Sequence, residues 1–214
     1  MHKGKSFLAP PRLFKAEFAQ YFPNFQGRTL LKDTIERDTT PVIEKKISVV
    51  SVFSSAWAEA QAATFVSKNN NPELHQLVES SKGVAQFVRI NLEDNTLKNM
   101  LVRLFMPGLR KKADESDWRR YFLIKRTVTT EIRDAIGLLN SKVGYTYLTD
   151  GQCKIRWAGS GIAEIGEKDG LVNGLKKLMD EANTSVKPLA KNGPGKGQAK
   201  NVKKPVLAEV RKAV

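Results

Sequence analysis

The chain has 214 residues, 41% of them hydrophobic, which is enough to bury one good core with appended segments. Its formal net charge is +14, from 36 Lys and Arg residues against 22 Asp and Glu residues. The single cysteine, Cys153, excludes an intrachain disulfide and the class of disulfide-stabilised secreted proteins, and no run approaches the ~20 apolar residues of a membrane span.

Residues 1–44 are predicted to form an extended lead-in to a folded domain. The segment contains Pro10-Pro11 and the aromatic run Tyr21-Phe22-Pro23-Asn24-Phe25. Because aromatic rings are poorly left in water, we expect this run to hold the segment against the domain. Its first acidic residue is Glu17, after several basic residues, as in mitochondrial targeting segments, although the two prolines oppose a targeting helix.

From residue 45 to 184 the sequence alternates strand and helix patterns. Ile47–Phe53 is a β-branched apolar run, typical of a strand buried on both faces. Ser54 and Ser55 are candidate N-caps for a helix rich in Ala, Glu and Gln. The elements expected next are that helix from Ala56 to about Lys68, a turn at Asn69–Pro72, a short helix Pro72–Val78, a strand Gln86–Asn91, an amphipathic helix Thr96–Met106, a strand Tyr121–Ile124, and a helix capped by Thr129 or Thr130 that ends near Leu139.

The end of this domain predicts a β-hairpin followed by a helix. Gly144–Thr149 and Cys153–Trp157 are expected strands, joined by an Asp150-Gly151 turn. A helix follows from Glu164 to about Ala182. Strands separated by helices and closed by a hairpin and a final helix predict an α/β domain with a sheet of mixed direction. This order is similar to a thioredoxin-like fold of the peroxiredoxin or copper-chaperone type.

Residues 185–214 are predicted to be a disordered basic tail. From Val186 onward the chain holds eight Lys and Arg residues and one Glu, and it lacks a periodic apolar pattern long enough to fold. Such a tail either keeps the protein soluble or draws it to an anionic surface such as lipid or RNA. A basic residue close to an anionic membrane contributes ~1 kcal/mol at most. The sequence leaves both interpretations open.

The corner after Ile47–Phe53 resembles a thioredoxin active site without its cysteines. In thioredoxin-like oxidoreductases this corner carries a Trp followed directly by Cys-x-x-Cys. Trp57 matches that Trp, whereas Ala58 and Gln61 stand at the two thiol positions. Thiol–disulfide exchange requires a thiolate, so this chemistry is not expected here. For Trp57 itself, packing in the core is favoured over recognition of a partner.

Cys153 is predicted to be a buried structural thiol. Alternation places it on one face of its strand with Ile155 and Trp157, while Lys154 and Arg156 point to the other face. Such a thiol is inert, with a raised pKa. The alternative is a thiol peroxidase-like enzyme that uses Cys153.

The other chemical candidates are also assigned structural roles. His2 and His75 lie far apart, without thiolates or a second His at ligand spacing, so neither a metal nor another cofactor is expected. Gly159-Ser160-Gly161 lacks the Lys-Ser/Thr signature of a phosphate loop and is interpreted as a tight connection.

A basic region with interleaved aromatic residues occupies residues 103–126. Basic and aromatic side chains together are typical of RNA binding and of docking at a membrane interface, and as an alternative such loops are simply solvated. No RNA-module signature favours the first possibility. The residues that we expect at a partner or membrane surface are Arg103, Arg110, Lys111, Lys112, Trp118, Arg119 and Arg120.

Five sequence blocks occur in order between about Ser6 and Glu181. They are Ser6–Pro11, Tyr21–Phe25, Val52–Glu59, Ile136–Tyr145 and Cys153–Gly161. Together these blocks resemble the mitochondrial ATP synthase assembly factor ten family. The resemblance does not clearly include the basic tail.

This resemblance implies a non-catalytic assembly chaperone, peripheral on the matrix side of the mitochondrial inner membrane. Members of the family bind newly made subunit a of ATP synthase and promote its joining to the c-ring, and they carry no catalytic motif. The implied partners are therefore subunit a, indirectly the c-ring, and anionic lipid, without a specific nucleic acid. Gly144 stands where active thioredoxins have a cis-proline, which agrees with a remodelled groove.

The helix Leu97–Leu109 and the stretch Arg110–Arg126 are our expected client surface. A rival to the chaperone is a binder of RNA or the mitochondrial ribosome that acts through the basic tail.

Overall fold

A mixed sheet organises the part of the chain that the computed structural model describes, residues 4–92, 106–125 and 128–186. Its strand order is β2-β1-β5-β4-β3-β6-β7. The pairs β3–β4 and β4–β5 are parallel, and the other neighbouring pairs are antiparallel. The strands are β1 (Gln26–Thr29), β2 (Glu36–Asp38), β3 (Ile47–Phe53), β4 (Ala85–Leu92), β5 (Tyr121–Ile124), β6 (Tyr145–Thr149) and β7 (Ile155–Ser160).

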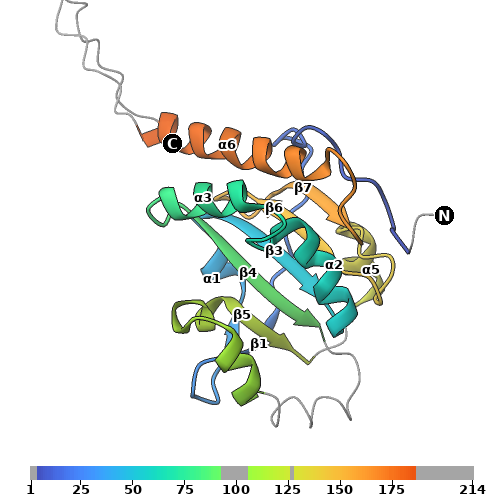
Figure 1. Cartoon of the computed structure of the whole chain (residues 1–214), viewed down its shortest axis with the longest axis vertical. Helices are drawn as coiled ribbons and strands as arrows, with labels where there is room; N and C mark the ends of the chain where they lie inside the picture. Colours follow the sequence, from blue (N-terminus) through green and yellow to red (C-terminus); the bar gives the residue numbers. More distant parts are fainter. Residues whose placement is uncertain (1–3, 93–105, 126–127, 187–214) are drawn as a thin grey trace, which may run out of the picture.

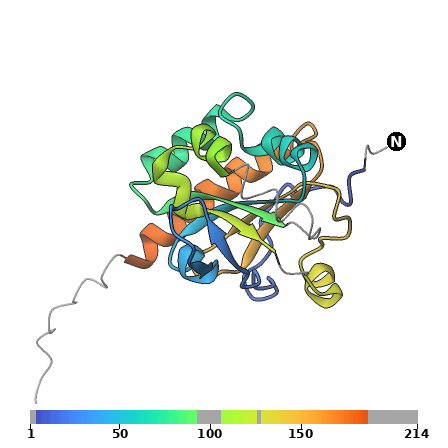
Figure 2. The same cartoon turned by 90° about the horizontal axis from the view of Figure 1, so that it is seen from below.

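Helices cover both faces of this sheet, as Figures 1 and 2 show. One face carries α2, α3 and α6, whose apolar side chains pack with Val49 and Leu148 of the sheet. The other face carries α1, α5 and part of the lead-in, over Val50 and Ile90. The helices are α1 (Thr40–Ile43), α2 (Ala56–Val66), α3 (Pro72–Ser80), the 3-10 helix η1 (Glu115–Arg120), α5 (Thr130–Ala135) and α6 (Glu167–Val186), with a further helical segment at 106–112.

The predicted thioredoxin-like α/β fold is confirmed by this connectivity. Parallel β3 and β4 are joined through α2 and α3, and the antiparallel pair β6–β7 is followed by α6. All seven residues of β3 are buried, as its β-branched apolar run predicts. Ser55 caps α2 by accepting the Ala58 N–H at 3.1 Å, and Thr129 caps α5 by accepting the Ile132 N–H.

The lead-in runs along β7 and covers the edge of the sheet. The Phe14 N–H donates to the Arg156 carbonyl at 2.7 Å, and the Ile155 N–H donates to the Gln20 carbonyl at 2.8 Å. Trp157 Nε1 donates to the Pro10 carbonyl at 2.8 Å. An exposed strand edge is a template for unwanted pairing, so this segment protects β7 as a further strand would. The predicted anchoring role holds for Phe22 and Phe25, which are buried.

The structure departs from the sequence prediction in several elements. The lead-in contains β1, β2 and α1, none of which was predicted; β1 pairs with β5, and β2 pairs with β1. Helix α5 ends at Ala135 instead of near Leu139, since Gly137 adopts a left-handed φ of 70°. Most of the predicted helix Thr96–Met106 lies outside the described residues, as do residues 187–214 of the predicted tail. Within the described chain, none of the helices is long and apolar enough to cross a membrane.

Candidate functional site

The corner between β3 and α2 is sealed at the positions where a thioredoxin-like oxidoreductase carries its thiols. Ala58 is fully buried, and Gln61 is 2% exposed. Gln61 Oε1 accepts the Gly144 N–H at 2.9 Å, which ties α2 to the start of β6. A Cβ atom on Gly144 would lie 2.0 Å from the Ala58 carbonyl oxygen. The two elements are therefore in backbone contact, and no groove remains between them.

A very small cavity lies beside this corner in the described part of the chain. It has a volume of about 10 Å³ and is bordered by Ser54, Ser141 and Tyr145. Such a volume holds about one water molecule. The positions of Ala58 and Gln61 offer no thiol, and this cavity is too small for a small substrate.

Trp57 is exposed, so the prediction that it packs in the core is wrong. Its exposed fraction is 55%, whereas Ala58, Gln61, Ala62 and Phe65 form the buried face of α2. Position 57 lies beside that helical stripe, and its side chain is directed to solvent. A Cβ atom on Gly4 would contact the ring at 3.7 Å, so the lead-in passes close to it.

Cys153 is buried, as predicted, but it lies in the loop before β7 with a left-handed φ of 62°. Burial, together with Glu44 and Asp150, raises the pKa of its thiol. The predicted shared face with Trp157 is wrong. A register shift opposite Leu148 and Thr149 places Cys153 and Ile155 in one core cluster and Trp157 in the other.

We expect iodoacetamide to modify Cys153 at least about tenfold more slowly in the folded chain than in urea, because burial lowers both access and thiolate fraction. The protonated thiol also favours the folded state. This stabilisation is complete at pH values below the unfolded pKa of the thiol, and it is lost as the pH rises through the raised folded pKa. Mass spectrometry of timed samples measures the modification, with Cys153→Ser as the blank. Equal rates in both states would contradict the buried assignment.

His75 and the Gly159-Ser160-Gly161 segment contribute to structure. His75 is half-buried; its Nε2 contacts the Val66 carbonyl at 2.7 Å, and its ring lies 4.6 Å from that of Phe87. His2 lies outside the described residues, among which no group of three or more potential metal-ligating His, Cys, Asp or Glu side chains occurs. The Ser160 hydroxyl accepts hydrogen bonds from the Ser6 and Phe7 N–H groups, so the Gly159-Ser160-Gly161 segment anchors the lead-in.

The predicted partner surface divides into structural and free residues. Arg110 is structural, since its Nε and Nη2 donate to the Leu30 and Leu31 carbonyls at 2.6 and 3.0 Å. Trp118 is half-buried beneath it, at 5.7 Å from the guanidinium. The exposed residues of the predicted surface are Lys111, Lys112 and Arg119. Arg120 pairs with Asp117. Arg103 lies outside the described residues.

An apolar pocket that the sequence did not reveal lies between the lead-in and α5. It has a volume of about 450 Å³ and is lined by Phe7, Phe14 and Phe18 together with side chains from the end of α5 and from β7. Phe18 is 75% exposed and Phe14 41% exposed. Both rings therefore stand at the surface although the same segment buries Phe22 and Phe25. The sequence showed an excess of aromatic residues in the lead-in, but it did not show which of them would face solvent.

The fold and the corner between β3 and α2 together define a thioredoxin-like domain. It has no thiols at the positions where thioredoxin-like oxidoreductases carry them. The chain belongs to the ATP10 family: the profile described as "ATP10 protein" matches residues 1–178. The protein of Eremothecium gossypii called mitochondrial ATPase complex subunit ATP10 is 35% identical over 164 residues, which are 75% of this chain and 58% of that protein. The Saccharomyces cerevisiae protein of the same name is 28% identical over 187 residues, which are 82% of this chain and 66% of that protein.

The chain thus spans about three-fifths of the length of these curated relatives. Among solved structures, a secreted thiol-disulfide isomerase from Corynebacterium glutamicum superimposes with a TM-score of 0.49 at 14% sequence identity, covering 84% of this chain and 96% of that chain.

Proposed function

We propose that this protein is a non-catalytic chaperone for assembly of the membrane sector of the mitochondrial ATP synthase. It binds newly made subunit a and promotes the joining of subunit a to the c-ring. It acts as a peripheral protein on the matrix side of the inner membrane. Membership of the ATP10 family supports the pathway, since curated relatives carry the name of a mitochondrial ATPase complex subunit.

The sealed corner carries the proposal that the protein binds without turnover. Its thiol positions hold Ala58 and Gln61, and Gln61 is engaged with Gly144. The thiol of Cys153 is buried, with a raised pKa, which opposes the alternative of a peroxidase-like enzyme. Peroxide consumption by the pure protein that depends on Cys153 would favour that alternative. The RNA-binding alternative depends on the tail from Val186 onward, nearly all of it outside the described residues.

The apolar pocket beside α5 is the proposed seat for an apolar segment of subunit a. A membrane subunit held outside the bilayer exposes apolar side chains, and burying one of them releases about 1.5–3 kcal/mol. The rings of Phe14 and Phe18 enlarge the pocket with exposed apolar surface. Solvent-exposed apolar patches of this kind are typical of protein interaction sites.

The basic segment after residue 106 is the proposed membrane contact. Lys111, Lys112 and Arg119 are exposed, and Lys32 lies 5.8 Å from the Trp118 ring on the same side. Basic groups near an anionic bilayer contribute ~1 kcal/mol each, so this cluster holds the protein weakly and reversibly. The predicted helix Leu97–Leu109 completes this surface in our proposal, and most of it lies outside the described residues.

Crosslinking to newly made subunit a in mitochondria tests the pocket, and binding to anionic vesicles tests the basic segment. Phe14→Ser with Phe18→Ser is expected to reduce the crosslinked fraction severalfold, because it removes two apolar contacts. Ile165→Ser is the matched control, since Ile165 is fully exposed and lies outside the pocket lining. Charge reversal at Lys111, Lys112 and Arg119 is expected to lower the fraction bound to anionic vesicles.

Unchanged crosslinking in the double Phe variant would remove the pocket from the proposal. Unchanged vesicle binding after charge reversal would remove the basic segment. A wild-type chain that crosslinks to no ATP synthase subunit would overturn the chaperone function itself.

A further inference from the structure

The sheet face that carries α2, α3 and α6 has an opening over the central strand β4. Strand β4 lies between β3 and β5, yet Arg89 in its middle is exposed. Residues at this position are normally covered in a parallel sheet. Here α2 and α3 pack on one side of the opening and η1 lies on the other, as Figure 1 shows. A pocket of about 250 Å³ occupies the space between them.

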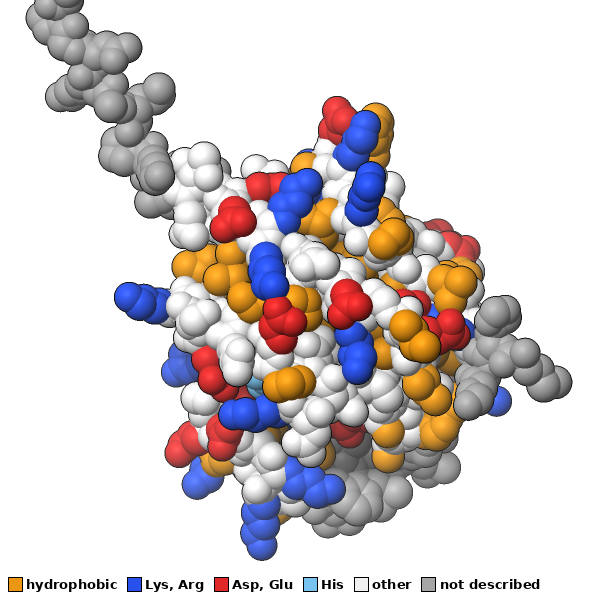
Figure 3. Space-filling view, turned by 45° about the horizontal axis from the view of Figure 1, so that its top comes forward, with side chains coloured by type: hydrophobic (Ala, Val, Ile, Leu, Met, Phe, Trp, Pro, Cys, Tyr) orange, Lys and Arg blue, Asp and Glu red, His pale blue; other side chains and the backbone are white. Residues whose placement is uncertain are grey.

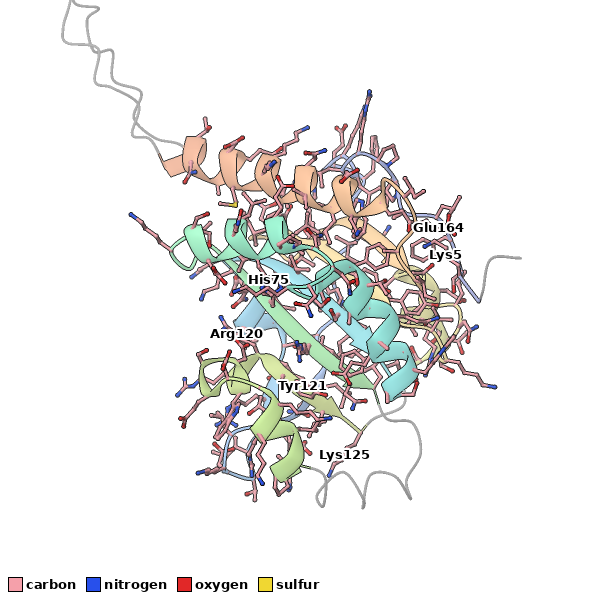
Figure 4. All side chains as sticks on the ribbon, in the orientation of Figure 1. Lys5, His75, Arg120, Tyr121, Lys125 and Glu164 are labelled. Atoms are coloured by element: carbon pink, nitrogen blue, oxygen red, sulfur yellow. The ribbon has the colours of Figure 1, made fainter. Side chains whose placement is uncertain are left out.

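Three hydrogen-bond donors converge on this pocket from different elements. Arg89 and Tyr121 are direct neighbours across β4 and β5, and Arg120 precedes Tyr121 at the end of η1. Figure 4 labels Arg120, Tyr121 and His75, which lie around the opening between α3 and η1. The structure gives Arg89 no hydrogen bond or ion pair to any described residue. Its guanidinium therefore has five donors available to a ligand.

Two of these donor groups are buried without a hydrogen-bond partner. Tyr121 is 3% exposed, and its hydroxyl makes no hydrogen bond of acceptable geometry to a described residue, although the Asn91 side chain lies close to it. The buried Nε of Arg120 also has no hydrogen-bond partner among the described residues. Burial raises the pKa of Tyr121, with a further rise from Glu59 and opposing effects from Arg89 and Asn91, so the hydroxyl keeps its proton. An unpaired buried donor is costly, because the hydrogen bonds that it loses to water are not replaced. Such groups in a native pocket call for a ligand that accepts their hydrogen bonds.

The charge of the pocket is positive. Lys68, Arg89 and Arg120 line it; Lys68 pairs with Glu79 at 3.6 Å and Arg120 pairs with Asp117, whereas Arg89 has no ion-pair partner among the described residues. Asp117 binds the terminal nitrogen of Arg120, which orients the guanidinium and leaves its Nε for the pocket. Elsewhere on this side of the molecule basic, acidic and apolar side chains are intermixed, as Figure 3 shows. The positive charge that remains unpaired in the pocket lining is therefore that of Arg89.

We propose that this pocket binds a phosphate group through Arg89, Arg120 and Tyr121. Phosphate presents oxygens in a tetrahedral arrangement, so one group can accept from the strand floor and from the η1 wall together. Guanidinium groups pair with phosphate in a bidentate manner, which suits the free Arg89. A carboxylate presents its two oxygens in one plane, whereas the three donor groups approach from the strand floor and from the η1 wall.

The phosphate can belong to a soluble phosphate compound or to a phospholipid headgroup. Both share the chemistry that the pocket recognises. The pocket includes Arg120 of the basic segment, but it is separate from the apolar pocket and from Lys111, Lys112 and Arg119. Its test needs neither subunit a nor an assembled complex, so its outcome is independent of the proposed function.

Titration of the full chain with inorganic phosphate at constant ionic strength tests the proposal. Isothermal titration calorimetry is expected to show saturable binding, with sodium acetate as the carboxylate comparison. Arg89→Gln is expected to raise the Kd at least about tenfold, because it removes a charge-assisted contact. Tyr121→Phe is expected to raise it about threefold to tenfold, and Lys177→Gln, which removes the same charge from exposed α6 surface, to leave it unchanged.

Thermal unfolding without phosphate checks that both variants fold. Arg89 is exposed and the Tyr121 hydroxyl is unpartnered, so neither change removes a structural hydrogen bond. No saturable phosphate binding, or an equal loss in the Lys177→Gln variant, would overturn the site. Acetate binding as tight as phosphate would overturn the phosphate assignment.

Sedimentation with vesicles distinguishes the two sources. Wild-type chain and Arg89→Gln are compared on vesicles that contain an anionic phosphomonoester lipid and on neutral phosphatidylcholine vesicles. A deficit of Arg89→Gln on the anionic vesicles alone assigns the pocket to a headgroup. Equal sedimentation of the two chains, with phosphate binding lost in Arg89→Gln, assigns it to a soluble phosphate compound.

Discussion

Glu167→Gln is expected to lower the free energy of unfolding by about 3–5 kcal/mol, because it breaks a buried ion pair. Lys5 Nζ and Glu167 Oε2 lie 2.7 Å apart, with side chains only 3% and 6% exposed. The same carboxylate accepts the Ala9 and Glu164 N–H groups at 2.7 Å. Glutamine would leave the Lys5 charge buried without a counter-charge, with only neutral carbonyl oxygens as acceptors. Urea denaturation followed by circular dichroism measures the loss.

The exposed ion pair Lys176–Glu73 provides a matched control. Its side chains are 45% and 57% exposed, so Glu73→Gln is expected to cost about 1 kcal/mol at most. Limited proteolysis should cleave the lead-in before residue 25 faster in Glu167→Gln than in the wild type. A loss below about 1 kcal/mol for Glu167→Gln would show that the pair does not hold the lead-in. Figure 4 shows how Lys5 lies beside the loop that carries Glu164.

Gly144→Ala is expected to destabilise the fold by about 3 kcal/mol, because the new methyl group has no space. Its Cβ would lie 2.0 Å from the Ala58 carbonyl oxygen and 3.0 Å from the Ala62 nitrogen, both backbone atoms. Helix α2 would have to move from β6, and the bond between Gln61 and the Gly144 N–H would be lost. The midpoint of urea denaturation measures the effect.

Gly108→Ala is the control for the added methyl group itself. Nothing lies within 4 Å of a Cβ atom at Gly108, and the residue is in the helical segment 106–112. Alanine favours helix over glycine by up to about 1 kcal/mol, so stability should be unchanged or slightly higher. If Gly144→Ala were as stable as Gly108→Ala, the contact between α2 and β6 would not be the tight seal described above.

Local patterns predicted the central elements well. The bounds of β3 and β5 match their predictions, and Ser55 caps α2 as its residue type suggests. The hairpin was also predicted, but its turn is longer than Asp150-Gly151. The Asp150 carboxylate accepts the N–H groups of Gln152 and Lys154, which organises a loop before β7 begins at Ile155. Such a side-chain turn changes the register that simple alternation assumes.

Residue type failed to predict exposure where packing depends on distant segments. Trp57 was expected in the core and is exposed, because the buried stripe of α2 runs through its neighbours. Arg110 was predicted only as part of a partner or membrane surface, and the structure adds that it donates to the carbonyls after β1, some 80 residues away in the sequence. The donors Arg89, Arg120 and Tyr121 carry no motif spacing, since they meet only when β4 and β5 pair.

The sequence by itself determined the order of the core elements, the absence of thiols from Ala58 and Gln61, and the resemblance to the ATP10 family. These depend on local periodicity and on residue identity, which need no knowledge of the fold. Only the tertiary structure decided that the lead-in covers β7, that Phe14 and Phe18 stand at an apolar pocket, and that β4 leaves a basic opening. The reason is physical: burial and convergence of charge come from contacts between residues far apart in the chain, and local pattern carries no record of those contacts.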